Sequence, residues 1–165
     1  MLKDSTMEQA ANHLGDLLSL RGQTMVTAES CTGGWIVKAL TDRPGSSDYV
    51  LGGLVAYSNS MKRELLHVSA ENLEQHGAVS EPVVRQMVAG AVKATGADFA
   101  IATSGVAGPG GGSEDKPVGT VWFAWGSPAS GIVAHRCHFD GDRDAVRRQS
   151  VVYALQGLTD YVQTL

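Results

Sequence analysis

Residues 28–34, Ala-Glu-Ser-Cys-Thr-Gly-Gly, bring two hydroxyls, a thiol and two adjacent glycines into one short stretch. A β-branched run precedes the stretch and an apolar segment follows it, which predicts a strand that turns directly into a helix. The first N–H groups of a helix lack intrahelical partners, and glycine lets a ligand come close to the backbone. Ser30 could therefore act as a nucleophile beside an oxyanion or phosphate site formed by Thr32, Gly33 and Gly34. The alternative is that Ser30 or Thr32 only caps the helix.

Cys31 offers a second nucleophile at the same turn. A thiol at a helix N-terminus has a lowered pKa, and the thiolate is the reactive form. No histidine that could pair with this thiol is evident in the sequence, so we place Cys31 behind Ser30.

Residues 57–62, Tyr-Ser-Asn-Ser-Met-Lys, carry a candidate base for that serine. Lys62 could take a proton from Ser30 if burial or a neighbouring charge lowers the lysine pKa, and the Tyr57 hydroxyl could relay or orient that proton. The alternative is a solvated lysine on a short helix and a tyrosine at the end of a strand. The spacing matches neither the Tyr-x-x-x-Lys pair of short-chain dehydrogenases nor a Ser-x-x-Lys motif. A Ser–Lys pair must therefore form through the fold.

A glycine-rich segment at residues 103–113 follows a predicted buried strand. Ligands collect at the carboxyl ends of strands in open α/β sheets, so Ser104, Gly105 and Gly108 are candidate binding residues. The segment is neither a Walker A loop nor a Gly-x-Gly-x-x-Gly motif. The alternative is a flexible surface loop.

Two arginines lie near the start of the predicted last helix. Arg143 and Arg147 are four residues apart and share a helix face, where they could bind a phosphate or a carboxylate. The alternative is that Asp140, Asp142 and Asp144 cap this helix and form ion pairs with the arginines.

The periodicities along the chain predict the elements that must position these residues. Helices are expected at 7–21, about 31–41, 60–66, 71–75, 81–95 and 142–163, with a loop at 43–48. Strands are expected at 24–29, 51–57, 99–103, 119–125 and 132–139, the last two joined as a hairpin. Helices and strands alternate early and the strands pair late, so we expect an α/β fold. It would be a single layered domain over residues 1–165, with a mixed sheet of about five strands flanked by helices.

Composition narrows the class of protein. The chain has 165 residues, 43% of them hydrophobic and 18% charged, and a net charge of −4 without a Lys/Arg run, which argues against nucleic acid as a partner. No stretch has the length and apolarity of a membrane span, and residues 1–6 lack the apolar core of a signal peptide. Two cysteines and five scattered histidines do not suggest a disulfide framework or a metal site. We expect a cytoplasmic enzyme or binding domain without a cofactor.

Taken together in this order, the motifs resemble the CinA carboxy-terminal domain family, the stand-alone nicotinamide-nucleotide amidohydrolases. The resemblance runs from the first helix to the last. It is carried by residues 28–34, 57–59 with Lys62, 76–80, 104–109, 116–121 and 141–143. One departure is Ser104, where the family often has threonine, and serine keeps the hydroxyl. Longer family members add an amino-terminal domain with pyrophosphatase chemistry, which has no counterpart in this sequence.

The resemblance implies deamidation of nicotinamide mononucleotide to nicotinic acid mononucleotide and ammonia, in pyridine nucleotide salvage. It implies Ser30 as nucleophile, with Lys62 and Tyr57 as its base pair, and an oxyanion held by N–H groups at residues 32–34. We expect the nucleotide to be bound by Thr32, Gly33, Gly34, Asn59, Ser104, Gly105, Gly108, Arg143 and Arg147. We also expect a homodimer that binds neither nucleic acid nor a membrane. The alternative is a catalytically silent nucleotide-binding or interaction module of the same family.

Overall fold

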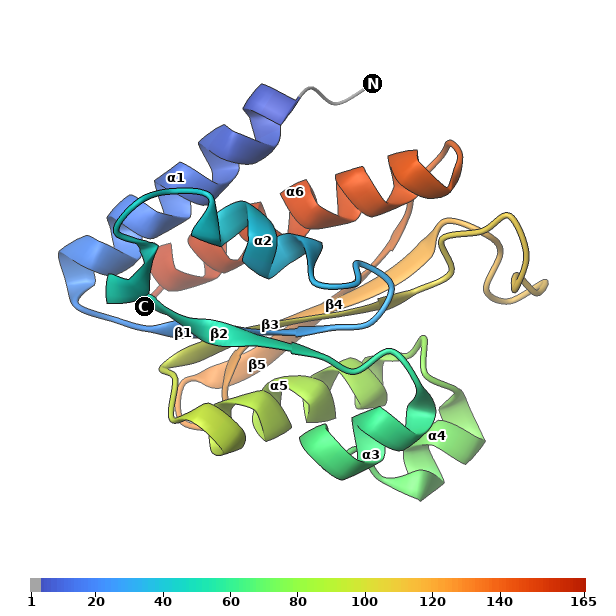
Figure 1. The fold of residues 1–165 in the computed structure, drawn as a ribbon. Coiled ribbons are helices and arrows are strands. Elements are labelled where there is room, and N and C mark those ends of the chain that lie inside the picture. The colour runs from blue at the N-terminus through green and yellow to red at the C-terminus, as the bar shows by residue number, and fades with distance from the viewer. Residues whose placement is uncertain (1–3) are drawn as a thin grey trace.

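A twisted five-stranded sheet lies between two layers of helices in the computed structural model, which describes residues 4–165 (Figure 1). The strands are β1 (Met25–Glu29), β2 (Val50–Val55), β3 (Phe99–Gly105), β4 (Thr120–Ser127) and β5 (Gly131–His138), in the spatial order β2-β1-β3-β4-β5. The pairs β1–β2 and β1–β3 are parallel, and β3–β4 and β4–β5 are antiparallel. The predicted mixed α/β sheet is therefore confirmed. The first half of the polar segment at residues 1–6 lies outside the described residues.

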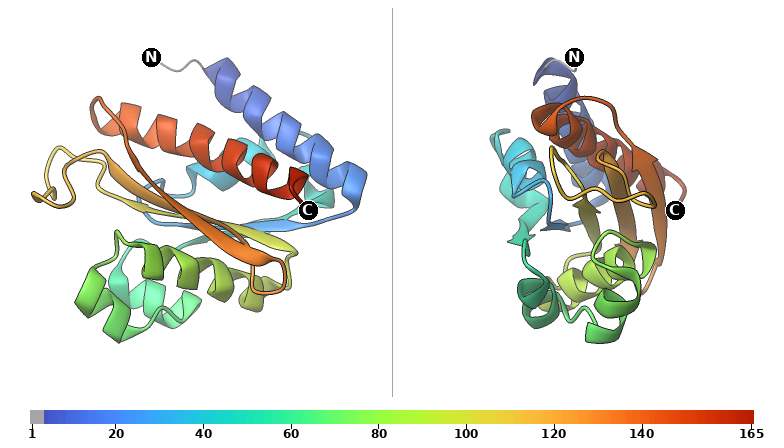
Figure 2. Two further views of the ribbon diagram at one scale, coloured as in Figure 1. Left: turned by 180° about the vertical axis from the view of Figure 1, so that it is seen from behind. Right: turned by 90° about the vertical axis from the view of Figure 1, so that its right-hand side faces the viewer.

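Helices lie on both sides of the sheet, as the views from behind and from the side show (Figure 2). One face carries α1 (Asp4–Arg21), α2 (Trp35–Thr41) and α6 (Arg143–Gln163), and the other carries α3 (Asn59–Leu66), α4 (Ala70–His76) and α5 (Glu81–Thr95). A short 3-10 turn, η1 (Ser46–Asp48), precedes β2. Within residues 4–165, no helix has the length and apolar character needed to cross a membrane.

The sheet separates two apolar cores, because its central strands are covered on both faces. Every residue of β1 is buried, which explains why this strand lacks the polar and apolar alternation of a half-exposed strand. On the α1 face, Leu14 and Leu18 pack into one core; on the α5 face, Val84 and Met87 pack into the other. Burial of these side chains fixes the helices against the sheet.

The predicted helices and strands are all present, most of them with slightly shifted ends. The largest shift concerns α2, which begins at Trp35 and not near residue 31. Residues 31–34 form turns, and Gly34 has a φ of 96°, a left-handed conformation that glycine adopts without a steric penalty. The turn after β1 is therefore longer than predicted, and Ser30 stands before it.

Three parallel strands end at the same edge of the sheet. Glu29 at the end of β1 is level with Val55 of β2 and with Thr103 of β3. Ser30 and Tyr57, which follow β1 and β2, and Ser104, which lies in the last part of β3, therefore come together although they are far apart in the sequence.

Candidate active site

A pocket of about 250 Å³ opens at this edge of the sheet. It brings together seven of the predicted site residues, namely Ser30, Tyr57, Asn59, Lys62, Ser104, Gly105 and Arg143. Cys31, the second candidate nucleophile, also lines the pocket, together with Ala78, Val79 and Ala107, to which the sequence analysis assigned no role. Ala78 and Val79 belong to the segment after α4 that contributed to the family resemblance, which was the available signal for them.

A serine and a lysine are in direct contact in this pocket. Lys62 Nζ lies 2.9 Å from Ser30 Oγ and also donates to the backbone carbonyl of Tyr57 at 2.9 Å. Both side chains are buried, Lys62 with 1% of its surface exposed and Ser30 with 7%. Burial lowers the pKa of Lys62, because a charged ammonium loses water there. Among residues 4–165, Lys62 forms no ion pair, so no neighbouring carboxylate stabilises its charged form.

The start of α3 aims Lys62 at Ser30. Ser58 caps this helix, because its side chain accepts a hydrogen bond from the Met61 N–H at 3.1 Å. The Lys62 N–H donates to the Ser58 carbonyl at 3.1 Å, which closes the first helical turn. Lys62 is thereby a buried residue on an otherwise largely exposed helix, and the alternative of a solvated lysine is wrong.

Tyr57 holds Lys62 through its backbone and not through its phenol. Its side chain is 61% exposed at the pocket mouth, with the hydroxyl 3.4 Å from Arg143 Nη2. These contacts do not support the expected proton relay through the Tyr57 hydroxyl, because Lys62 contacts Ser30 directly.

Arg143 comes into the pocket from the start of α6. Its Nη1 donates to the Gly108 carbonyl at 2.8 Å, and it takes part in no ion pair within the described chain. The capping alternative holds for Asp142, which accepts from the Ala145 N–H at 2.9 Å. Capping leaves the Arg143 guanidinium available as a cation at the pocket.

The two predicted arginines have different surroundings. Arg147 lies behind the turn and outside the pocket, where its Nε donates to the Cys31 carbonyl at 3.0 Å and its Nη2 to the Thr32 carbonyl at 3.2 Å. Four more predicted binding residues are also absent from the pocket lining: Thr32, Gly33, Gly34 and Gly108. The geometry thus assigns Arg143 and Arg147 separate positions despite their shared helix face.

The N-terminus of α2 is occupied by a residue that sequence reasoning missed. Glu29 accepts hydrogen bonds from the Ile36 and Val37 N–H groups, so neither Ser30 nor Thr32 caps the helix. The Gly33 N–H donates to the Ser30 carbonyl at 3.1 Å and is not free for an oxyanion. The sequence signal for this role was the position of Glu29, which is the last residue of a strand that carries no other charged side chain.

Cys31 differs from its predicted state. It is buried, and the loss of water raises the pKa of its thiol to about 12, although we expected a lowered value. Burial outweighs the helix N-terminus here, because a thiolate needs solvation or a close cation.

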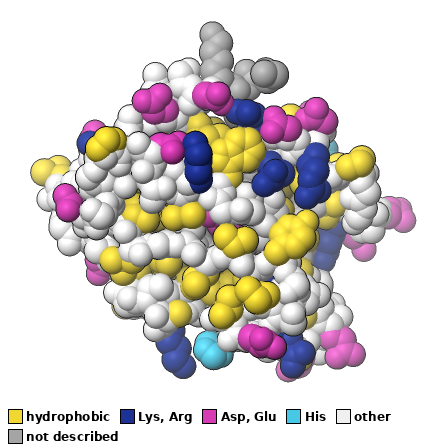
Figure 3. Space-filling view, in the orientation of Figure 1, with side chains coloured by type: hydrophobic (Ala, Val, Ile, Leu, Met, Phe, Trp, Pro, Cys, Tyr) yellow, Lys and Arg dark blue, Asp and Glu magenta, His cyan; other side chains and the backbone are white. Residues whose placement is uncertain are grey.

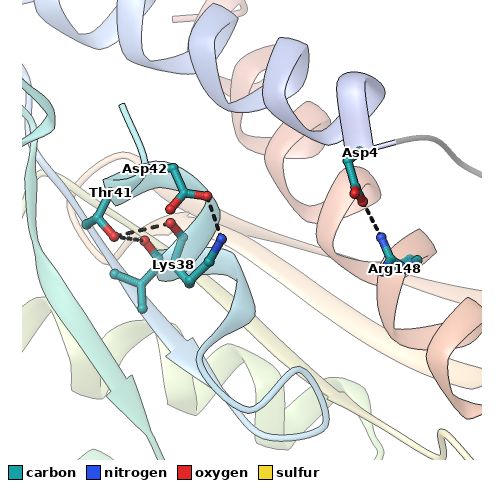
Figure 4. A network of polar contacts seen from close by, with 6 residues as sticks. Asp4, Lys38, Thr41, Asp42 and Arg148 are labelled. Atoms are coloured by element: carbon teal, nitrogen blue, oxygen red, sulfur yellow. Dashed lines mark hydrogen bonds and ion pairs between the residues drawn. The ribbon is translucent and has the colours of Figure 1, made fainter. Parts of the chain in front are cut away.

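A larger hollow of about 760 Å³ lies among α1, α2 and α6. Several of its charged residues pair with one another: Lys38 of α2 with Asp42, which directly follows that helix, and Asp4 of α1 with Arg148 of α6 (Figure 4). It holds no serine or cysteine beside a base. Among residues 4–165, no three His, Cys, Asp or Glu side chains group as a metal site would require.

Comparisons with known proteins agree with this description. Residues 7–162 match the model of the CinA C-terminal domain family. The nicotinamide-nucleotide amidohydrolase PncC of Escherichia coli K12 is 54% identical over 95% of both chains. PncC of Pseudomonas putida is also 54% identical, over 90% of this chain and 92% of its own.

A crystal structure of a CinA superfamily protein from Klebsiella pneumoniae has the same fold, with a TM-score of 0.92 and 40% identity over 96% of this chain and 99% of that one. The sheet, the helical layers and the motifs define an α/β protein with its pocket at the carboxyl ends of parallel strands. The chain belongs to the CinA C-terminal domain family.

Proposed function

We propose that this protein is a nicotinamide-nucleotide amidohydrolase that converts nicotinamide mononucleotide and water into nicotinic acid mononucleotide and ammonia. The observation that carries the proposal is the direct contact between Ser30 Oγ and the buried Lys62 Nζ. The names of two relatives, both 54% identical over at least 90% of this chain, support the substrate. The expected place of the reaction is pyridine nucleotide salvage in the cytoplasm.

Acylation begins with a proton transfer. Neutral Lys62 takes the proton of Ser30, and Ser30 Oγ attacks the carboxamide carbon of the substrate. The Tyr57 carbonyl accepts a hydrogen bond from Lys62 and stabilises the ammonium that forms. The backbone N–H of Cys31, which follows the nucleophile, donates to no backbone carbonyl within residues 4–165, and we assign the oxyanion to it.

Deacylation reuses the same lysine. The Lys62 ammonium gives its proton to the leaving nitrogen, so ammonia departs and an ester on Ser30 remains. Neutral Lys62 then takes a proton from a water molecule that attacks the ester carbon. Cleavage of the ester returns the proton to Ser30 and releases the carboxylate product.

Arg143 recognises the phosphate of the nucleotide in this proposal. It is a pocket-lining arginine without an ion pair in the described chain, and a phosphate accepts two parallel N–H bonds from a guanidinium. Asn59 and Ser104 line the same pocket and offer an amide and a hydroxyl to the ribose or the carboxamide. These roles are assigned from the position of each side chain in the pocket and from the hydrogen bonds that it can form.

The test is ammonia release from nicotinamide mononucleotide, with the product identified by mass. Free nicotinamide and NAD serve as comparison substrates, and Ser30→Ala as the inactive control. Release that needs Ser30 supports the proposal. Tight binding of the nucleotide without ammonia would instead support the alternative of a silent binding module, which would have no need for a buried Ser–Lys contact.

We also propose that the protein forms a homodimer through the β2 edge of its sheet. Within the described residues β2 pairs with β1 alone. The segment from β2 to α3 carries a group of exposed large hydrophobic residues: Leu51, Val55, Tyr57, Met61 and Leu65. Figure 3 looks onto this side, where hydrophobic side chains gather across the middle and charged ones lie mainly toward the margins. An exposed apolar edge strand is usually covered. Sedimentation of the wild type and of Leu51→Lys tests this, since the substitution should yield monomers.

A further inference from the structure

We propose that Glu29 is a positioning residue for Ser30: its buried carboxylate joins the turn that carries the nucleophile to the first turn of α2. The inference rests on the proposed function in one respect, that Ser30 is the nucleophile. Glu29 directly precedes Ser30, has none of its surface exposed and lies outside the pocket lining.

The carboxylate accepts four hydrogen bonds from three parts of the chain. Oε1 accepts from Thr32 Oγ1 at 2.6 Å and from the Ile36 N–H at 2.9 Å. Oε2 accepts from Thr27 Oγ1 and from the Val37 N–H, each at 3.0 Å. One side chain thereby ties β1, the turn and α2 together.

Only a carboxylate of this length satisfies all four donors. Glutamine presents one oxygen and one NH₂ group, so one buried backbone N–H of α2 would face another donor, and one threonine hydroxyl would have to turn from donor to acceptor. Aspartate is one methylene shorter and cannot keep the same reach. The chemistry of the donor set therefore requires glutamate at this position.

The turn has few other attachments that could replace these bonds. Gly34, the N-cap of α2, provides no side-chain cap. The Ser30 N–H donates to the Thr103 carbonyl at 3.1 Å, and the Thr32 hydroxyl lies 2.9 Å from Thr103 Oγ1. Arg147 holds the carbonyls on the other side of the turn. Glu29 is thus the anchor on the N–H side, and its loss would let Ser30 Oγ drift from Lys62.

The test uses Glu29→Gln and, as a milder change, Thr32→Val, which removes the hydroxyl that bonds Glu29 at 2.6 Å and Thr103 Oγ1 at 2.9 Å, with little change in volume. The rate at which a fluorophosphonate probe labels Ser30 is measured beside kcat and KM for nicotinamide mononucleotide. The control is Leu158→Ala, a fully buried residue of α6 that lies outside the pocket lining. Melting temperatures show how much each variant is destabilised, and all rates are measured on folded protein.

We expect Glu29→Gln to slow labelling and lower kcat by about 10-fold or more while KM stays within about 2-fold, because a small displacement of a nucleophile costs rate rather than affinity. Thr32→Val should slow labelling and lower kcat by about 3-fold each. Leu158→Ala should lower the melting temperature without slowing labelling. If Glu29→Gln does not fold, Thr32→Val alone decides. Unchanged labelling in Thr32→Val or in folded Glu29→Gln, or equal slowing in Leu158→Ala, overturns the positioning role. Absence of labelling at Ser30 in the wild type overturns the proposed function instead.

Discussion

The side-chain nitrogen of Lys62 lies 2.9 Å from the hydroxyl oxygen of Ser30, although 32 residues separate them in the sequence. Ser30 follows β1 and Lys62 lies in the first helix after β2, and these two strands are parallel neighbours. The contact is therefore a product of strand order. It joins a weak nucleophile to a base whose charge is disfavoured by burial.

Ser30→Ala should abolish deamidation while the protein stays folded, since only one hydroxyl is removed. We expect a loss of at least about 10³-fold in kcat, the scale seen when an enzyme loses its nucleophile. Cys31→Ser should lose less than about 10-fold, because the Cys31 thiol has a raised pKa of about 12 and is protonated at neutral pH. Ammonia release measures both. The reverse result would make Cys31 the nucleophile.

Lys62→Arg should be nearly as inactive as Lys62→Ala. Arginine keeps the positive charge, but it cannot give up a proton near neutral pH. In the wild type the reactive amine is neutral, so the rate should rise with pH through the lowered pKa of Lys62 and then level off. The pH dependence of kcat/KM gives this profile. Substantial activity in the arginine variant would show that Lys62 acts only as a fixed charge.

Burial of Lys62 also predicts a pH-dependent stability. The folded chain binds the Lys62 proton less readily than the unfolded chain, so the free energy of unfolding should rise with pH between the lowered pKa and the ordinary one. Lys62→Met removes the titrating group, and this part of the rise should disappear. Urea unfolding of both proteins, from neutral to moderately alkaline pH, measures the difference. Parallel pH curves for the two proteins would contradict the lowered pKa.

Tyr57→Phe should retain most activity. The backbone carbonyl that holds Lys62 remains in the variant, and the lost hydroxyl only faces Arg143 at 3.4 Å. We expect a loss of about 10-fold or less, mainly in KM. Steady-state kinetics decide between this and the relay expected from the sequence. A loss as large as that of Lys62→Ala would restore the hydroxyl as a proton carrier.

Arg143→Ala should weaken recognition of the phosphate. Loss of a charge-assisted contact costs roughly 1.5–3 kcal/mol, or about 10- to 100-fold in kcat/KM for nicotinamide mononucleotide. The loss should be small for nicotinamide riboside, which has no phosphate. Arg63→Ala, an exposed arginine of α3 outside the pocket, is the matched control. Equal losses on the two substrates would mean that Arg143 supports the fold or the catalytic pair.

The elements of this fold could be predicted from the sequence because their signals are local. The sequence around α5, with Pro82 in its first turn, predicted the bounds that the structure has. The start of α2 was misplaced for a local reason as well. Gly33 and Gly34 permit left-handed backbone, and periodicity does not reveal whether such residues belong to a helix or to the turn before it.

The types and spacing of the residues determined, without any structure, the helices and strands, the motifs and the family that they resemble. The contacts among the side chains depended on the tertiary structure. Strand order placed Lys62 against Ser30, the close packing of the turn gave Glu29 four donors, and burial raised the thiol pKa of Cys31. The shared helix face of Arg143 and Arg147 was visible in the sequence, but their partners come from segments about 35 and 116 residues away. Local propensity acts over a few residues, whereas burial and long-range contacts exist only once the whole chain has packed.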